Sequence, residues 1–403
     1  MKKVWDKWTR IALVKRILVG LILGAILGIA VPQATGIAIL GDVFVSALKA
    51  IAPLLVFFLV ISSLCNAGKS HGGVIKTVII LYMFSTVLAA VIAVFASMAF
   101  PVKMTLANAA TDTSAPQGIV EVLNNLLLNV VANPVSSLVN ANYVGILMWA
   151  VLLGLAFRAA DKMTKKVLAD VADGISMVVT WIINLAPFGI FGLVFNTVST
   201  NGLDIFTTYG KLLLLLVGCM LFIYFVTNPL LVYWCIRQNP YPLIFHCLKR
   251  SALTAFFTRS SAANIPVNMK VCEEMGLDRD TYSVTIPLGA TINMDGAAIT
   301  ITVMTMATAF TLGIHVDIPT AIILSLLAAL SACGASGVAG GSLLLIPMAC
   351  SLFGISDDIS MQVVAVGFII GVVQDSVETA LNSSSDLLLS ASAIPRRQII
   401  SGE

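Results

Sequence analysis

The sequence predicts an all-α membrane protein with eight transmembrane helices and two re-entrant helical hairpins. Hydrophobic residues fill 59% of the 403 positions, charged residues only 11%, and the mean hydropathy is +1.00; soluble domains carry about a quarter charged residues. Apolar stretches of roughly 20 residues, enough to cross a bilayer core as helix, recur along the chain, whereas the alternating pattern of a membrane barrel does not appear. The net charge of +3 is too small to indicate nucleic-acid binding.

Six spanning helices are predicted before residue 246. Their apolar segments cover residues 11–31, 40–64, 74–100, 142–158, 175–199 and 207–236. With a cytoplasmic N-terminus, connections rich in Lys and Arg alternate with connections that have few or none, as the positive-inside rule requires. We therefore expect the connection from Arg158 to Lys166 in the cytoplasm. Residues 101–141, where Lys103 is the only basic residue, are expected outside.

A hairpin is predicted at residues 246–275. This segment is only moderately apolar and has Arg259 and Pro266 near its middle. If it crossed the membrane, Lys270 and Arg279 would lie outside, against the charge rule. We therefore expect it to enter and leave on the cytoplasmic side.

The rest of the chain predicts a second hairpin between two helices. The helices are expected at 282–312 and 360–392, and the hairpin, interrupted by glycines, at 319–350. The last helix returns the C-terminus to the cytoplasm. Two opposed hairpins, each followed by a helix, form an inverted repeat of the kind that places a transporter's site at the bilayer midplane. Irregular backbone persists at that depth only where protein or water satisfies it, so the hairpin tips should meet at a binding site.

Polar residues interrupt the helix predicted at 282–312. Residues 289–296 begin and end with glycine and contain Asn293 and Asp295. A charge at a helix centre costs about 2.5–3.5 kcal/mol, so Asp295 should have a partner. One interpretation is an ion pair with Arg259 that holds the fold. The other is that the glycines permit local unwinding, which frees carbonyl oxygens to join Asn293 and Asp295 around a hard cation.

The last helix carries a polar stripe at helical spacing. Its members are Asp375, Glu378, Thr379, Asn382 and Asp386. Because the flanking sequence is membrane-like, the stripe indicates a pathway or binding site inside a bundle. Its surplus negative charge requires cations. An amino acid would supply an ammonium group for Asp375, which leaves Asp295 and Asp386 to bind metal ions.

The first hairpin tip suits the other end of an amino acid. Ser260 and Ser261 offer hydroxyl and backbone N–H groups, and half-helix N-termini at the midplane favour a carboxylate.

Two other classes of protein fit parts of the pattern. An ion channel could line its pore with the polar stripe, although channels usually build rings from repeated subunits. Gly-Ala-Ser-Gly at 334–337 looks like an intramembrane serine protease. A nucleophilic serine needs a base, and the histidines, His71, His246 and His315, are expected at or near membrane faces.

Several motifs together resemble the dicarboxylate/amino acid:cation symporters, the family of the glutamate transporters. They are Tyr82-x-x-Ser85-Thr86, residues 258–261, residues 287–296, the glycine-rich second hairpin and Asn382-x-x-x-Asp386. The resemblance covers nearly the whole chain and is closest to bacterial sodium-coupled members that carry serine and threonine. It implies a homotrimer in the bacterial inner membrane that works as an elevator. Its scaffold part would be residues 11–66 and 142–200, and its transport part residues 74–100 and 207–392.

The resemblance also implies sodium as the coupling ion, at three sites, with no organic cofactor. The first site would use backbone groups of Gly289, Asn293 and Asn382 and the carboxylate of Asp386. The second would use backbone groups of Thr291, Ala332, Cys333 and Ala335. The third would use Tyr82, Ser85, Thr86, Asn293 and Asp295.

For the substrate, the resemblance implies contacts from both serines of the first tip, Val338, Asp375, Thr379 and Asn382. The acidic-substrate members hold an arginine where this chain has Glu378 and an aspartate where it has Gly371. An anionic side chain facing Glu378 would be repelled in a low-dielectric pocket. We therefore expect a small neutral amino acid, serine or threonine first, with other neutral or dicarboxylic amino acids as the alternative. Arg259 is expected to pair with Asp375 or Glu378 in part of the cycle.

Overall fold

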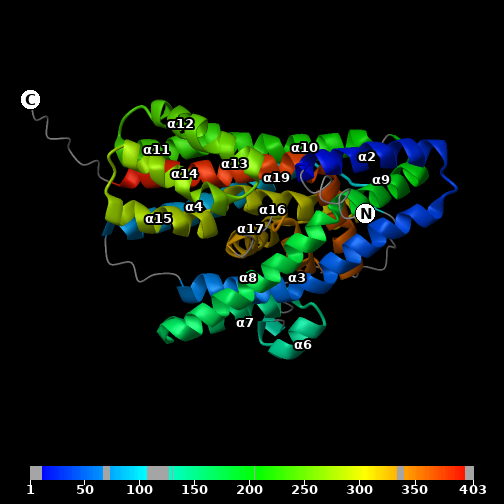
Figure 1. Ribbon diagram of the computed structural model, residues 1–403, viewed down its shortest axis with the longest axis horizontal. Coiled ribbons are helices and arrows are strands. Elements are labelled where there is room, and N and C mark those ends of the chain that lie inside the picture. Colours follow the sequence, from blue (N-terminus) through cyan, green and yellow to red (C-terminus); the bar gives the residue numbers. More distant parts are fainter. Residues whose placement is uncertain are drawn as a thin grey trace, which may run out of the picture.

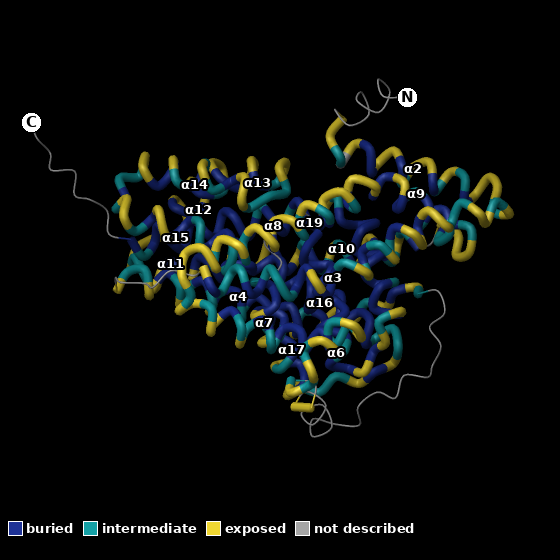
Figure 2. The backbone as a smooth tube through the Cα atoms, turned by 60° about the horizontal axis from the view of Figure 1, so that its bottom comes forward, coloured by how far each residue is buried: buried dark blue, intermediate teal, exposed yellow. Residues whose placement is uncertain are grey.

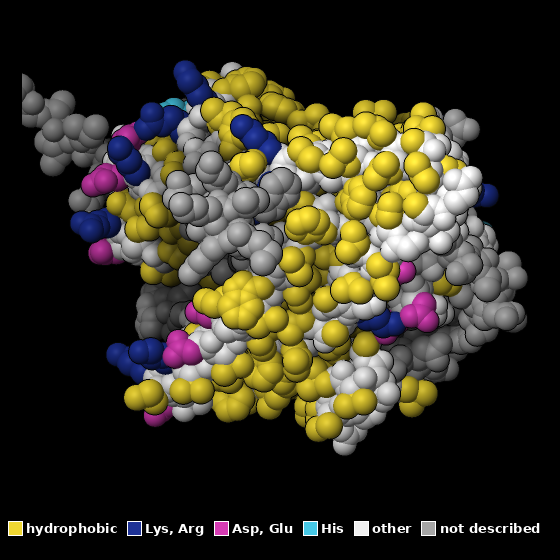
Figure 3. All heavy atoms as spheres, turned by 45° about the vertical axis from the view of Figure 1, so that its right-hand side comes forward, with side chains coloured by type: hydrophobic (Ala, Val, Ile, Leu, Met, Phe, Trp, Pro, Cys, Tyr) yellow, Lys and Arg dark blue, Asp and Glu magenta, His cyan; other side chains and the backbone are white. Residues whose placement is uncertain are grey.

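Every regular element that the computed structural model describes is a helix (Figure 1). The structure describes residues 11–66, 73–106, 127–128, 130–203, 205–333 and 340–394. Within them, six segments are long and apolar enough to cross a membrane: Thr35–Asn66, Gly73–Ala99, Lys162–Asn184, Ile205–Ile236, Arg279–Thr311 and Asp357–Ala393. Figure 3 shows hydrophobic side chains over much of one face, with most of the charged ones toward its edges. This is the surface expected of a protein surrounded by lipid.

A first group of helices comes from the N-terminal half. It comprises α2 (Leu13–Ala30), η1 (Thr35–Ala38), α3 (Ile39–Asn66), α6 (Pro134–Val139), α7 (Tyr143–Ala156), η2 (Phe157–Ala159), α8 (Lys162–Asn184) and α9 (Ala186–Asn201). The helix α2 lies along α9, and α3 packs on α7, α8 and α9. Gly20, Gly24 and Gly28 of α2 meet α9: a Cβ at Gly20 would lie 2.2 Å from the carbonyl oxygen of Pro187. Small residues at this spacing allow close helix packing in lipid.

The span expected at 175–199 differs in the structure. It is divided into α8 and α9 at Leu185, where Pro187 in the first turn of α9 suits a new helix start. The lysines expected in a connection, from Lys162 to Lys166, belong to the first turns of α8. Only Ala172, Val179 and Ile183 of α8 are buried. A search for apolar runs overlooks the beginning of such an exposed helix.

A second group forms around two central helices. It comprises α4 (Gly73–Ala99), α10 (Ile205–Phe222), the π-helical turn η3 (Ile223–Thr227), α11 (Asn228–Ile236) and the described helices from residue 241 onward. At its centre lie α16 (Asp295–Thr311) and α19 (Asp357–Ala393). All of residues 295–309 are buried, as is 83% of the most apolar stretch of α19. Figure 2 shows this interior in dark blue.

The first predicted hairpin is a helix–turn–helix unit. Its first arm runs through α12 (Tyr241–Cys247), η4 (Leu248–Ala252) and α13 (Leu253–Thr258), and its second arm is α14 (Ser261–Glu274). The turn lies at Arg259 and Ser260. Arg259 has φ of +53°, a left-handed conformation that is unfavourable for a residue with a side chain and is kept only where the surroundings fix it. The surroundings of its guanidinium group are described below.

The second predicted hairpin is described in part. Its first arm is α17 (Ile318–Ala332), and its second contains η5 (Leu343–Leu345) and α18 (Ile346–Ser351). Residues 334–339, which include Ala335, Val338 and the protease-like motif, lie outside the described residues.

The helix expected at 282–312 is interrupted between its two glycines. α15 (Arg279–Ile292) ends and α16 begins at Asp295, with Asn293 and Met294 in non-helical conformations. The local unwinding expected here is confirmed, and it is confined to these two residues.

Candidate functional site

The interruption between α15 and α16 is bound to the middle of α19 through side-chain amides. The Asn293 Nδ2 atom donates to Asp386 Oδ1 at 2.9 Å and to Ser385 Oγ at 2.8 Å. In the same direction, the Gly296 backbone N–H at the start of α16 donates to Asn382 Oδ1 of α19 at 2.7 Å. Non-helical backbone therefore faces the polar stripe of α19 in a fully buried region.

Asn293 and Asp386 leave oxygen atoms that suit a hard cation. The Asn293 Oδ1 atom is buried and has no hydrogen-bond partner among the described residues, and such a group is rare in native proteins. A Cβ at Gly289 would lie 3.0 Å from Asp386 Cγ and 2.8 Å from the Tyr82 hydroxyl oxygen. Carboxylate and carbonyl oxygens are the ligands that hard cations take. The donor set fits the cation expected for Gly289, Asn293, Asn382 and Asp386.

Tyr82 connects α4 to the same region. Its hydroxyl oxygen lies 3.0 Å from the Asp386 carbonyl oxygen, 3.3 Å from that of Thr285 and 2.6 Å from Ser390 Oγ. The side chain is fully buried. Tyr82 thus connects α4 to α15 and α19 next to the interruption.

A second carboxylate, Asp295, receives hydroxyl groups from α4. Ser85 Oγ donates to Oδ2 at 2.8 Å, and Thr86 Oγ1 donates to Oδ1 at 3.1 Å. The Thr86 hydroxyl also accepts the Met294 backbone N–H at 3.2 Å. No ion pair among the described residues includes Asp295. The interpretation that Asp295 pairs with Arg259 is therefore wrong for this structure.

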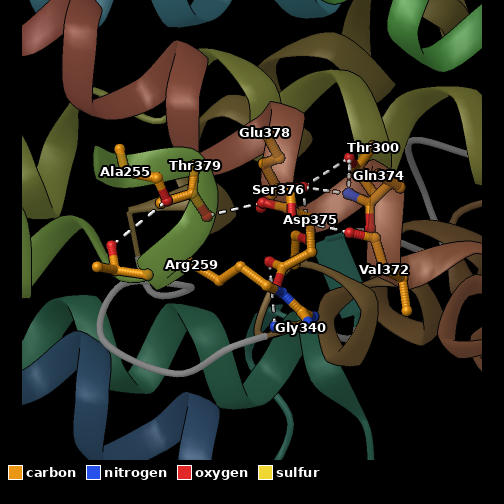
Figure 4. Close-up of polar contacts among 12 residues, drawn as sticks. Ala255, Arg259, Thr300, Gly340, Val372, Gln374, Asp375, Ser376, Glu378 and Thr379 are labelled. Atoms are coloured by element: carbon orange, nitrogen blue, oxygen red, sulfur yellow. Dashed lines mark hydrogen bonds and ion pairs between the residues drawn. The ribbon is translucent and has the colours of Figure 1, made fainter. Parts of the chain in front are cut away.

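Arg259 pairs instead with Asp375 (Figure 4). The Arg259 Nη2 atom lies 2.5 Å and its Nε atom 2.6 Å from Asp375 Oδ2. The other oxygen, Oδ1, accepts the Gly340 backbone N–H at 3.3 Å. The first hairpin tip and the second arm of the other hairpin thus converge on one carboxylate of α19. This contact also fixes the strained turn at Arg259.

Glu378 has neutral partners only, within the part of the chain that is described. Three donors converge on its Oε2 atom: Thr300 Oγ1 at 2.7 Å, Ser342 Oγ at 2.9 Å and Gln374 Nε2 at 2.5 Å. Gln374 Nε2 also donates to Thr300 Oγ1 at 2.7 Å. Figure 4 shows Thr300 and Gln374 grouped together, away from the hairpin turn that carries Arg259. Of the two expected partners of Arg259, the structure therefore selects Asp375.

The remaining predicted residues lie at the ends of helices or within α19. The Ser260 side chain caps α14 by accepting the Ala263 N–H at 3.2 Å, and Ser261 begins that helix. Thr379 Oγ1 donates to the Asp375 carbonyl oxygen at 2.8 Å. Both serines are half-buried, whereas Thr379 is buried.

The backbone groups expected to form another cation site are brought together in part. Cys333 Sγ lies 3.7 Å from the Ile292 carbonyl oxygen, so the end of α17 meets the end of α15 beside Thr291. Ala332 is buried at this end of α17.

Comparison with known proteins decides the family. The model of the sodium:dicarboxylate symporter family matches residues 13–393. The chain belongs to this family. Its relatives include the serine/threonine transporter SstT of Bifidobacterium adolescentis, 58% identical over 98% of this chain and 92% of that protein. Proteins of the same name from two strains of Streptococcus thermophilus are 55% and 56% identical over 98% of both chains.

Membership of the sodium:dicarboxylate symporter family makes this chain a multi-pass membrane transporter and not an enzyme. The protease interpretation is thereby excluded. The resemblance drawn from the motifs is confirmed at the level of the family.

This symporter contains polar contacts that sequence reasoning missed. Asn264 Nδ2 of α14 donates to Ser383 Oγ at 2.7 Å and to Ser251 Oγ at 2.9 Å, and Asn268 Nδ2 donates to the Ser383 carbonyl oxygen at 2.8 Å. All four side chains are buried and hold both arms of the first hairpin against α19. Amides four residues apart on a weakly apolar segment are a signal that could have indicated them.

Proposed function

We propose that this protein is a sodium-coupled symporter that takes up serine and threonine. The observation that carries the proposal is that three buried carboxylates of α19 contact the two hairpins and the interruption between α15 and α16. Asp375 meets the two hairpins, Asp386 meets the interruption before α16, and Glu378 meets α16 and the second hairpin. The names of relatives more than half identical to the chain support the choice of substrate.

Asp375 is the acceptor for the ammonium group of the amino acid. Because Asp375 is 4% exposed and already paired with a guanidinium group, it is an anionic site that an ammonium group can take over. The α-carboxylate would lie near Thr379, Asn382 and the N-terminus of α14, where Ser260, Ser261 and the helix dipole favour a negative charge. Val338 would complete the site from the second hairpin tip.

Sodium ions bind deeper along α19 and α4. One site uses Gly289, Asn293, Asn382 and Asp386, and its support is the unpaired Asn293 Oδ1 atom beside a carboxylate. Another uses Asp295, to which the Ser85 and Thr86 hydroxyl groups donate, together with Tyr82 and Asn293. A third uses backbone groups of Thr291, Ala332, Cys333 and Ala335. Binding at these sites before the substrate would neutralise the surplus acids and couple uptake to the sodium gradient.

Transport proceeds by movement of one helix group against the other. The division into a scaffold (residues 11–66 and 142–200) and a moving part (residues 74–100 and 207–392) has support in the packing. α2, α3, α7, α8 and α9 pack mainly on one another, and α4 packs on α16 and α17 of the second group. The two hairpins are re-entrant, both termini are cytoplasmic, and three copies assemble in the bacterial inner membrane.

Uptake into proteoliposomes tests the function. Purified protein should accumulate labelled serine when sodium is higher outside and should not when sodium is equal on both sides or is replaced by potassium. A channel would only equilibrate serine. In Glu378→Arg, serine uptake should fall and acidic amino acids should begin to compete, because an attractive charge replaces a repulsive one. Full serine selectivity in that variant would contradict the pocket assignment.

A further inference from the structure

We infer that Glu378 is the acceptor for the side-chain hydroxyl group of the substrate, so that the pocket selects β-hydroxy amino acids over their deoxy analogues. The inference rests on the proposed function and concerns how the same site recognises its ligand. It gives Glu378 an attractive role in addition to the repulsion of acidic side chains, and it makes Thr300 and Gln374 positioning residues.

The first observation is the uneven use of the Glu378 carboxylate. Thr300, Ser342 and Gln374 all donate to Oε2. Within the described residues, no hydrogen bond reaches Oε1. The residue is only 5% exposed, but Oε1 is not a fully enclosed atom, so it is the oxygen that a ligand can still reach. A ligand hydroxyl group that donates to Oε1 would form a hydrogen bond to a charged acceptor.

The second observation is the position of Glu378 relative to Asp375. The two residues are three apart on α19, which places them on one face with Cβ atoms about 5–6 Å apart. Both meet the same short segment of the second hairpin, because Gly340 donates to Asp375 and Ser342 donates to Glu378. In serine and threonine, three bonds separate the ammonium nitrogen from the hydroxyl oxygen. Two neighbouring carboxylates match two such closely spaced donors.

The third observation is that the surroundings hold the carboxylate in place. Gln374 Nε2 donates to Thr300 Oγ1 as well as to Glu378. Because Thr300 accepts this bond, its own hydrogen is left for Glu378 Oε2 or for the Gly296 carbonyl oxygen at 3.0 Å. A Cβ at Gly296 would lie 3.0 Å from Glu378 Cα and Cγ, so this glycine lets α16 lie against Glu378.

Recognition of a hydroxyl group by a buried polar acceptor discriminates strongly against ligands that lack it. The sharpest comparisons use ligand pairs that differ by this one group: serine against alanine, and threonine against 2-aminobutyrate. Loss of a hydrogen bond to a charged acceptor is worth roughly 1.5–3 kcal/mol, or about a 10- to 150-fold difference in affinity. The wild-type protein should show a ratio in this range for both pairs.

The test measures half-inhibition of sodium-driven labelled serine uptake by each of the four amino acids in proteoliposomes. In Glu378→Gln, both ratios should fall about tenfold, because a neutral amide replaces the charged acceptor. Thr300→Val should lower both ratios although residue 300 does not contact the ligand. Thr300→Ser keeps the hydroxyl group, so its ratios should stay close to those of the wild type. Each ratio is taken within one variant, so differences in the amount of folded protein cancel.

Two results separate the inference from the proposed function. If the wild-type protein does not accumulate serine with sodium, the proposed function fails. If it does, but Glu378→Gln and Thr300→Val keep the wild-type ratios, the function stands and the hydroxyl assignment is wrong. Should Glu378→Gln fail to fold, the comparison of Thr300→Val with Thr300→Ser still decides the matter.

Discussion

Arg259 and Asp375 form an ion pair, 2.5 Å between Nη2 and Oδ2, whose side chains are only 12% and 5% exposed. The pair connects the first hairpin tip to the carboxylate that we assign to the substrate ammonium group. On this proposed assignment, a cation of the protein itself holds the place of the ligand's cation, and binding would exchange one for the other.

Arg259→Ala should make the protein more dependent on its substrate. Removing one partner of a buried pair costs about 3–5 kcal/mol, because the other charge is left uncompensated. The ammonium group of serine would restore part of that loss, so serine with sodium should raise the melting temperature more in the variant than in the wild type. Arg250→Ala is the matched control: Arg250 pairs with Glu274 in the same hairpin, but these side chains are 43% and 41% exposed. Equal stabilisation by serine in the wild type and Arg259→Ala would disprove the exchange.

Gly289→Ala should weaken sodium activation of uptake. The added methyl group would lie 2.8 Å from the Tyr82 hydroxyl oxygen and 3.0 Å from Asp386 Cγ, and overpacking of this kind costs roughly 1–3 kcal/mol. The sodium concentration for half-maximal uptake should rise about tenfold. Gly218→Ala in α10 provides the comparison, since nothing lies within 4 Å of its added Cβ. If both variants have the same sodium dependence as the wild type, the assignment of this cation site is wrong.

Ser85→Ala should also raise the sodium requirement. It removes a hydroxyl group that donates to Asp295 at 2.8 Å, and loss of a hydrogen bond to a buried charged group costs roughly 1.5–3 kcal/mol. Ser97 offers a close control because it is a buried serine of the same helix whose hydroxyl has no partner within the described ranges. Ser97→Ala should therefore behave as the wild type in sodium titrations of serine uptake. A larger effect at Ser97 than at Ser85 would count against the Asp295 site.

Much of this site was predictable because it follows local spacing. The stripe from Asp375 to Asp386 follows the 3.6-residue period of a single helix. The glycines at both ends of residues 289–296 indicate the interruption near Asn293. The partner of Arg259 was not predictable, since Asp295, Glu378 and Asp375 were all candidates and only three-dimensional packing separates them.

The surroundings of Glu378 were missed for the same reason. Thr300 and Ser342 lie 78 and 36 residues away in sequence, and an ordinary threonine or serine in an apolar helix carries no sign of its partner. The length of α8 was also missed, because its exposed first turns resemble a charged connection in composition.

Reversing the charges of an ion pair between α3 and α19 should show whether the two helix groups move against each other. Lys49 Nζ lies 2.7 Å from Asp358 Oδ1 and joins the groups through side chains that are 39% and 88% exposed. In an elevator this contact exists in only part of the cycle. Lys49→Glu should change the maximal uptake rate by up to about fivefold, the effect of an exposed pair worth 0.2–1 kcal/mol.

Lys49→Glu combined with Asp358→Lys should return the uptake rate toward the wild-type value. High salt should shrink the difference between the single variant and the wild type, because exposed charges are screened. A double variant as impaired as the sum of its parts would show that the contact plays no part in the movement.

The order of the helices along the chain has a consequence for biosynthesis. Residues 357–393 are synthesised after the helices that they contact, and they supply Asp375, Glu378 and Asp386. The preceding helices, with polar groups that include Asp295, are therefore in the bilayer before α19 inserts among them. A chain that stops short of α19 cannot build the binding site, so a truncated product would be distinguishable by its failure to gain stability from ligand.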